Sequence, residues 1–209
     1  MSVRLTPFVS GEYYHLYNRG NSKQVIFHDD QDHQYFMNLI GIMNNEMRAK
    51  SGVSKFTKLS AEALVSVGVY CLMPNHFHIL LKQEKDNGIT LFMQKMSTAY
   101  VMYYNKKYKR TGALFEGKFK SKYAGEDRYL KYLFAYIHLN PIKLIDENWK
   151  TSNFDKEKYK FLIEYPYSSF SEYSKGESLY TNKAAFPEYF PTVGDFTKEI
   201  HSWLKTNFS

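Results

Sequence analysis

The sequence predicts an α+β domain, and two observations carry this prediction. First, some segments alternate between apolar and polar residues with a period of two, as strands do. Second, longer segments between them carry the apolar stripe of amphipathic helices. Along the chain, the expected order is strand, helix, two strands, helix, strand, helix. With 209 residues the chain has the length of one large domain, or of one domain with an appendage, and it can bury a substantial core.

The chain starts with an expected strand and helix. Residues 11–21 alternate so that Tyr13, His15 and Tyr17 share one face of a strand. Asp29 and Asp30 can cap the helix that follows. The apolar stripe of this helix, which we interpret as core, consists of Phe36, Leu39, Ile40, Met43 and Met47.

A predicted hairpin forms the centre of the sequence. Residues 64–71 are rich in Val and predict a strand, residues 73–75 are turn formers, and residues 76–83 alternate as a second strand. The alternation places His76 and His78 side by side on one face. Neutral imidazoles on a rigid element are good ligands for a divalent metal, although an isolated His-x-His pair is often only a surface pair.

A basic strand is predicted after a second helix that covers residues 89–107. Residues 113–123 alternate, which gives one face a row of charged side chains: Glu116, Lys118, Lys120 and Lys122. The segment from Lys95 to Lys131 holds ten Lys and Arg against three Asp and Glu, so its charge equals the net charge of +7 of the whole chain. A charged strand is often just a solvated face, but charge concentrated beside a metal site suits a phosphate backbone.

The third helix, residues 126–140, is predicted to carry two stripes. Leu130, Leu133, Phe134 and Ile137 form the buried one, and Tyr129, Tyr132, Tyr136 and Asn140 form the other. Pro141 is expected to stop the helix, which puts Asn140 at its end, one turn beyond Tyr136. A Tyr stripe is usually packing, but this pair also offers a phenol nucleophile and a carbonyl ligand to one metal. Residues 195–204 predict a last helix.

Composition narrows the class of protein. A net charge of +7 favours a polyanionic partner, and an aromatic content of 18% suits a surface on which bases stack. Cys71 is the single cysteine, which excludes an internal disulfide and a cysteine zinc site. The N-terminal residues lack the pattern of a signal peptide, and no apolar stretch approaches the about 20 residues of a membrane span. We therefore expect a soluble, cytoplasmic protein without a membrane partner.

Five segments bear a family resemblance in their order and spacing. They are Tyr14-His15-Leu16-Tyr17-Asn18-Arg19-Gly20, Met73-Pro74-Asn75-His76-Phe77-His78-Ile79-Leu80-Leu81, Leu114-Phe115-Glu116-Gly117-Lys118-Phe119-Lys120-Ser121, Tyr136-Ile137-His138-Leu139-Asn140-Pro141 and Tyr165-Pro166-Tyr167-Ser168-Ser169-Phe170. Together they resemble the REP-associated tyrosine transposases, within the single-tyrosine HUH (His-hydrophobe-His) transposases of the insertion-sequence-200-like group. The resemblance covers roughly residues 10 to 175.

The resemblance implies a fold and a division of the chain. The family fold is a ferredoxin-like α+β domain, in which an antiparallel sheet carries the HUH strand and helices pack on one side. Residues 1–175 would form the HUH transposase-like catalytic domain, and residues 176–209 a C-terminal extension that packs on it. Where the family usually has an Arg-Ala-Gly-like stretch after Asn-Pro, this chain has Ile142-Lys143-Leu144-Ile145.

The resemblance also implies an activity: metal-dependent cleavage and transfer of single-stranded DNA through a covalent 5′-phosphotyrosine, on hairpin or repeat ends. Tyr136 would be the nucleophile, with Tyr129 and Tyr132 as fallback candidates. The ligands of Mg²⁺ or Mn²⁺ would be His76, His78 and Asn140. The residues expected to grip the DNA backbone are Arg110, Lys118, Lys120, Lys122 and Arg128.

Two other functions stay open at this point. The first is a domesticated DNA-hairpin-binding protein that has lost turnover, although a pure binder needs neither the histidines nor Tyr136. The second is a zinc hydrolase, which lacks a third Glu or His ligand at metalloprotease spacing and leaves the basic strand unexplained. Both a monomer and a homodimer are compatible with the resemblance.

Overall fold

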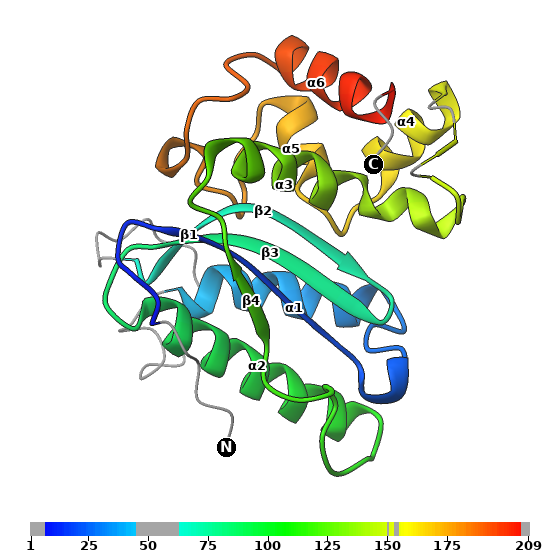
Figure 1. Ribbon diagram of the computed structural model, residues 1–209. Coiled ribbons are helices and arrows are strands. Elements are labelled where there is room, and N and C mark those ends of the chain that lie inside the picture. The colour runs from blue at the N-terminus through cyan, green and yellow to red at the C-terminus, as the bar shows by residue number, and fades with distance from the viewer. Residues whose placement is uncertain (1–6, 45–62, 150, 153–154, 206–209) are drawn as a thin grey trace.

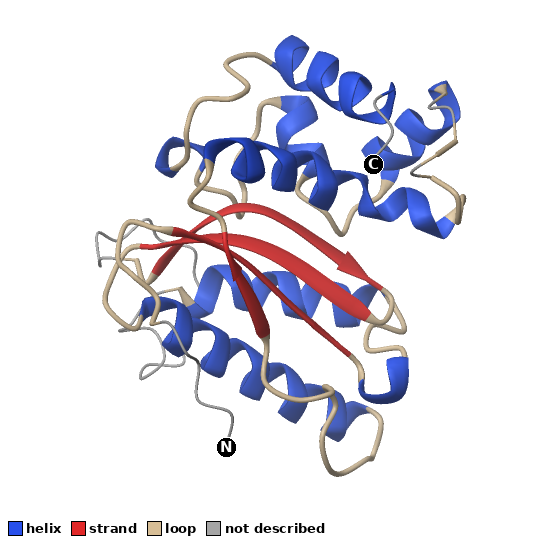
Figure 2. Ribbon diagram, viewed as in Figure 1, coloured by secondary structure: helices blue, strands red, loops and turns tan. Residues whose placement is uncertain are grey.

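A four-stranded antiparallel sheet runs through the middle of the molecule (Figures 1 and 2). The computed structural model describes residues 7–44, 63–149, 151–152 and 155–205. The strands are β1 (Tyr13–Arg19), β2 (Val65–Met73), β3 (His76–Gln83) and β4 (Lys120–Tyr123), in the spatial order β2-β3-β1-β4. With α1 (Asp30–Met43) after β1 and α2 (Gly88–Lys107) after β3, this is the ferredoxin-like α+β arrangement that the sequence predicts.

Helices α1 and α2 cover one face of the sheet, below it in Figure 1. Asp29 caps α1 as predicted, because its carboxylate accepts a hydrogen bond from the amide of Asp32. The odd-numbered positions of β3 point into this layer, as the alternation requires. The core here includes Phe36, Ile40, Phe77, Ile79, Leu81, Phe92 and Tyr100.

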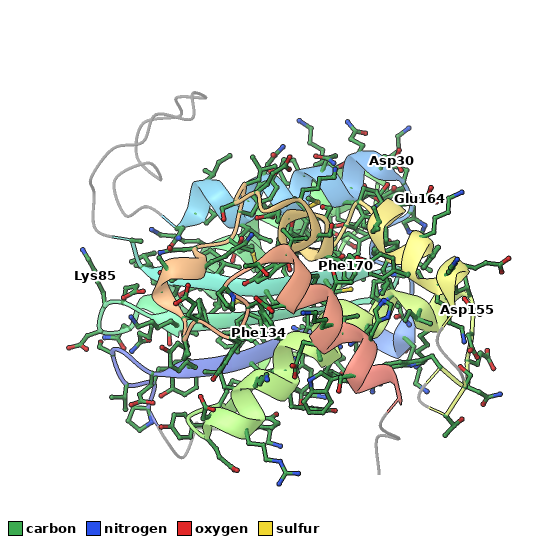
Figure 3. All side chains as sticks on the ribbon, turned by 90° about the horizontal axis from the view of Figure 1, so that it is seen from above. Asp30, Lys85, Phe134, Asp155, Glu164 and Phe170 are labelled. Carbon is green, nitrogen blue, oxygen red and sulfur yellow. The ribbon has the colours of Figure 1, made fainter. Side chains whose placement is uncertain are left out.

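The other face of the sheet is also covered, so the expectation of helices on one side holds for α1 and α2 only. Above the sheet lie α3 (Asp127–Leu139), α4 (Lys156–Glu164), α5 (Phe170–Lys175) and α6 (Val193–Lys205). Figure 3 looks down on this layer, where Phe134 and Phe170 are labelled and both are buried. The physical reason is that Val69, Cys71 and Leu80 make this sheet face apolar too, and it has to be removed from water.

The end of the chain packs against both the sheet and α3. Residues 165–169 run beside the outer edge of β2, where Leu72 donates a hydrogen bond to the carbonyl of Tyr167 and Ser169 donates one to Tyr70. Helix α6 contacts α3 and α5 and buries Phe196 and Ile200. The division of the chain at residue 175 stays a prediction. Among the described residues, no helix is long and apolar enough to cross a membrane.

Several element bounds differ from the sequence expectations. Of the predicted strand 113–123, only Lys120–Tyr123 joins the sheet as a strand, because Gly117 has φ +150° and bends the chain before it. Helices α4 and α5 were not predicted, since α4 is mostly polar and buries only Leu162. The sequence-predicted core residue Met47 lies outside the described residues.

A buried carboxylate fastens α1 to the C-terminal end of α2. The side chain of Asp32 is 0% exposed, and burial alone would raise its pKa, but hydrogen bonds to the carboxylate hold that pKa below its ordinary value. The donors are Lys107 at 2.7 Å, Tyr108 at 2.7 Å, the backbone of His28 at 2.8 Å and Tyr103 at 3.0 Å.

We expect Asp32→Asn to lower the free energy of unfolding by about 1.5–3 kcal/mol, since hydrogen bonds to a charged group are lost and Lys107 keeps a partly buried charge. Urea denaturation followed by circular dichroism measures this. The matched control is Glu164→Gln, which breaks an exposed pair with Lys160 and should cost less than about 1 kcal/mol. Equal stabilities of the two variants would contradict the prediction.

Candidate active site

The strand register gathers polar side chains on the sheet face that α3 covers. In the pairing of β1 with β3, Tyr17 lies opposite His78 and Arg19 lies opposite His76. In the pairing of β1 with β4, Lys122 lies opposite His15 and Lys120 lies opposite Tyr17. Because paired residues point to the same side of a sheet, the histidines share one face with Lys120 and Lys122.

Three imidazoles meet in this layer. His15 Nε2 and His78 Nδ1 lie 2.9 Å apart and share a hydrogen bond, and the two rings are 6% and 8% exposed. His76 Nδ1 is 2.6 Å from the side-chain oxygen of Asn75, and its ring centroid is 5.2 Å from that of His78. Within the described part of the chain, neither His76 nor His78 uses its Nε2 in a hydrogen bond.

Burial keeps these imidazoles uncharged. It lowers the pKa of His76 to about 4, assisted by the charges of Lys143 and Arg19. It lowers the pKa of His15 to about 4 as well, assisted by Lys122. The pKa of His78 falls well below its ordinary value through burial and the two neighbouring histidines. At neutral pH each ring therefore retains a nitrogen lone pair, which is what a metal or a hydrogen-bond donor requires.

Tyr136 is the member of the Tyr stripe that meets the histidines. Its ring centroid lies 5.7 Å from that of His78 and 6.3 Å from that of His15, both at 77°. The Tyr132 ring stacks on that of Tyr136 with centroids 5.7 Å apart, and Trp203 of α6 also contacts it. The Tyr129 ring stacks in turn on that of Tyr132, with centroids 6.1 Å apart. The row of stacked rings thus leads away from the imidazoles, and α3 presents one phenol to them.

Asn140 adjoins Tyr136 at the end of α3. Its amide nitrogen donates a hydrogen bond to the Tyr136 carbonyl at 2.8 Å, and the residue is 4% exposed. Burial raises the pKa of Tyr136, and a hydrogen bond from the Asn140 side chain opposes that increase. Pro141 ends α3 as predicted, but the backbone does not become extended: Asn140 has φ −52° and ψ −39° and begins the 3₁₀ helix η3 (Asn140–Leu144).

A pocket of about 340 Å³ opens beside these side chains, a volume near the lower end of small-molecule sites, which span roughly 300–1,000 Å³. Three of the sequence-predicted residues line it, namely His76, Tyr136 and Asn140. The remainder of the wall comes from η3 and the chain after it. These residues are Lys143, Glu147, Asn148, Trp149 and Thr151.

The predicted DNA-gripping residues are not all in one place. Lys118 and Lys120 line a groove of about 1460 Å³ between α2 and residues 115–121. Lys122 lies with its Nζ 4.3 Å from the centroid of the Tyr129 ring, and Arg128 is exposed in the first turn of α3. Arg110 lies just beyond the end of α2, where its guanidinium contacts Gln24, the carbonyl of Ala113 and the Tyr104 ring.

Sequence reasoning missed two residues of this site. His15 was placed on a strand face with Tyr13 and Tyr17, but its contact with His78 follows only from the β1–β3 register. Lys143 was noted only as a departure from a family pattern, and the structure puts it in the pocket wall beside His76 and Tyr136. For His15 the alternation was the available signal, and for Lys143 the signal was its spacing of three residues from Asn140.

Comparison with known proteins assigns the family. Residues 9–140, more than half of the chain, match the family described as Transposase IS200 like. The chain is an IS200-like transposase family member. No curated protein sequence matches it significantly.

The fold can be compared with two solved structures. A REP-associated tyrosine transposase bound to a REP hairpin superposes with a TM-score of 0.52 at 12% identity, over 87% of this chain and 91% of the other. The tRNA(His) guanylyltransferase of Saccharomyces cerevisiae gives a TM-score of 0.42 at 12% identity, over 77% of this chain and 80% of its own. The first similarity confirms the predicted α+β fold class.

Buried hydrogen bonds fix the Tyr136 helix of this IS200-like transposase to the sheet. His138, on the face of α3 opposite the pocket, has its Nε2 2.9 Å from the Ser169 hydroxyl oxygen. That oxygen also accepts a hydrogen bond from the Tyr70 amide at 3.0 Å, and the Ser169 amide donates to the Tyr70 carbonyl at 3.0 Å. The Ser-Ser element thereby joins α3 to β2.

We expect Ser169→Ala to lower the free energy of unfolding by about 1–3 kcal/mol. The substitution leaves two buried groups, His138 Nε2 and the Tyr70 amide, without their hydrogen-bond partner. Chemical denaturation measures the change. Ser174→Ala is the control, since within the described residues that hydroxyl bonds only the local Ser171 carbonyl, and its loss should cost less than about 0.5 kcal/mol. A Ser169→Ala protein as stable as the parent would show that this junction contributes nothing.

Proposed function

We propose that this IS200-like transposase family member is a metal-dependent single-stranded DNA endonuclease and strand transferase. It would act on hairpin or repeat ends through a covalent 5′-phosphotyrosine on Tyr136. The observation that carries the proposal is the meeting of one helix phenol with the HUH histidines: the Tyr136 ring lies 5.7 Å from that of His78, and His76, Tyr136 and Asn140 line one pocket. The family assignment supports the same reaction class.

The donor set fits Mg²⁺ or Mn²⁺. His76 and His78 are neutral and have their Nδ1 atoms held by Asn75 and His15, which directs Nε2 of each ring to be the ligand. The amide nitrogen of Asn140 is used by the Tyr136 carbonyl, which leaves its oxygen as a hard ligand. Among the described residues no group of three His, Cys, Asp or Glu side chains could hold a metal ion, so Asn140 would supply the third protein ligand.

The reaction would be an in-line transfer at phosphorus. The Tyr136 oxygen forms a bond to phosphorus, the bond from phosphorus to the 3′ oxygen breaks, the phenolic proton passes to water, and the 3′ oxygen takes a proton from water. A bound divalent ion supplies positive charge to the scissile phosphate. A phenol has a pKa of about 10 in water, and burial raises that of Tyr136, so cationic surroundings have to favour the phenolate when DNA binds.

Single-stranded DNA, or a hairpin with single-stranded flanks, is the substrate class we infer, because a phosphate has to enter a pocket bordered by β3 and η3. Lys122 is exposed on the site face and Arg128 is exposed in the first turn of α3, so both can contact the backbone. Lys118 and Lys120 border the neighbouring groove together with Tyr17. The structurally similar REP-associated transposase was solved bound to a REP hairpin, which supports DNA as the partner.

Covalent adduct formation tests the proposal. Labelled single-stranded oligonucleotides from the sequences flanking the gene are incubated with the protein and Mn²⁺ or EDTA, and then run on a denaturing gel. We expect a metal-dependent adduct with the parent and none with Tyr136→Phe, because phenylalanine lacks the attacking oxygen. Tyr129→Phe and Tyr132→Phe serve as matched controls and should form the adduct.

Each other outcome has a distinct meaning. An adduct that survives in Tyr136→Phe would transfer the nucleophile to Tyr129 or Tyr132. Tight DNA binding without an adduct on any flank would favour the hairpin-binding protein without turnover. An adduct that forms equally well in EDTA would overturn the metal dependence.

His15 is expected to tune the metal site through His78. Replacing it with Phe removes the hydrogen bond to His78 Nδ1, so we expect the Mn²⁺ concentration for half-maximal adduct formation to increase about 10–100-fold. His15→Gln keeps a polar side chain at this position and should change that concentration less. An unchanged Mn²⁺ dependence in His15→Phe would remove His15 from the site.

A further inference from the structure

Among the described residues that line the Tyr136 pocket, Lys143 is the one with a cationic side chain. It belongs to η3, three residues after Asn140, and it is exposed. It shares the pocket wall with His76, Tyr136 and Asn140. The basic strand does not account for a positive charge at this point, since Lys143 belongs to η3.

Three other cations near the site are engaged. Arg19 and Lys120 both pair with Glu116, and Lys122 lies over the Tyr129 ring. Lys143, by contrast, forms no ion pair or hydrogen bond with any residue in the described part of the chain, and Glu147, on the same pocket wall, is not paired with it. Its charge reaches the imidazole of His76, whose pKa it helps to lower. An uncompensated ammonium at the pocket is therefore available to an anionic ligand.

We propose that Lys143 binds a non-bridging oxygen of the phosphate that Tyr136 attacks. This inference rests on the proposed function and adds a second source of positive charge beside the divalent ion that His76, His78 and Asn140 would hold. The ammonium would approach the phosphate from η3, while the histidines approach it from β3. Both elements border the same pocket, so one phosphate can contact both.

The charge matters because attack adds negative charge around phosphorus. As the Tyr136 oxygen bonds to phosphorus and the 3′ oxygen leaves, the non-bridging oxygens carry more charge than in the intact strand. A fixed cation at that position stabilises the transition state more than the ground state, and removing such a group typically costs roughly 100- to 1,000-fold in rate. Lys143 is thus predicted to affect the rate of adduct formation more than DNA affinity.

The test compares Lys143→Gln, Lys143→Arg and the control Lys106→Gln, which removes the same charge from an exposed site on α2, across the sheet. The rate of adduct formation is measured in single turnovers at saturating oligonucleotide and Mn²⁺. The affinity for the oligonucleotide is measured separately, in proteins that also carry Tyr136→Phe and therefore cannot react. We expect Lys143→Gln to react at least about tenfold more slowly, with affinity changed less than about threefold, and Lys143→Arg to recover most of the rate. Lys106→Gln should react like the parent.

A second substrate separates contact with the phosphate from a structural effect. A methylphosphonate at the scissile position replaces one charged oxygen with a methyl group, so the charge that Lys143 would meet is gone. On this substrate the parent and Lys143→Gln should react at similar rates. Equal rates on the normal phosphate, or the same defect on both substrates, would overturn the inference. A parent that forms no adduct at all would overturn the proposed function first, and the inference with it.

Discussion

The Ser169 hydroxyl is the point on which the site geometry depends. It joins His138 of α3 to the backbone of Tyr70 in β2, and it lies in a segment that itself runs beside the edge of β2. Together with the apolar packing of α3 on the sheet, this buried side chain therefore sets where the tyrosine helix lies. Since His138 lies between Tyr136 and Asn140 in the chain, fixing its ring also fixes the rotation of the helix that carries both.

The two-sided sheet explains why this junction is needed. The α1–α2 layer completes a ferredoxin-like unit, and the strands would leave an apolar second face with Val69 and Leu80 exposed to water. Covering it with α3 buries that face and at the same time removes His15 and His78 from solvent. The same packing that stabilises the fold thus keeps the imidazoles neutral. Burial would destabilise a charged histidine, but it favours the neutral form, which is the form that can bind a metal.

The sequence predicts this site where the information is local. Alternation puts His76 and His78 on one face of β3, and Pro141 marks the end of α3, because both depend on residues next to each other. The contact of His15 with His78 joins residues 63 positions apart and requires the pairing register, which alternation does not specify. The covering of the second face by helices was missed for a similar reason: the apolar residues of β2 show burial but not what buries them.

The sequence also predicts which segment is basic, but not where the fold places each basic side chain. The alternating lysines of residues 113–123 read as one cationic row, yet Gly117 bends the chain, Glu116 neutralises Lys120, and Lys118 borders a groove away from the histidines. Lys143 belongs to no such row, and η3 returns it to the pocket because Asn140 keeps helical dihedral angles before Pro141. The number of lysines in a segment therefore predicts a polyanionic partner, whereas the pocket indicates which lysine would meet the reacting phosphate of the proposed function.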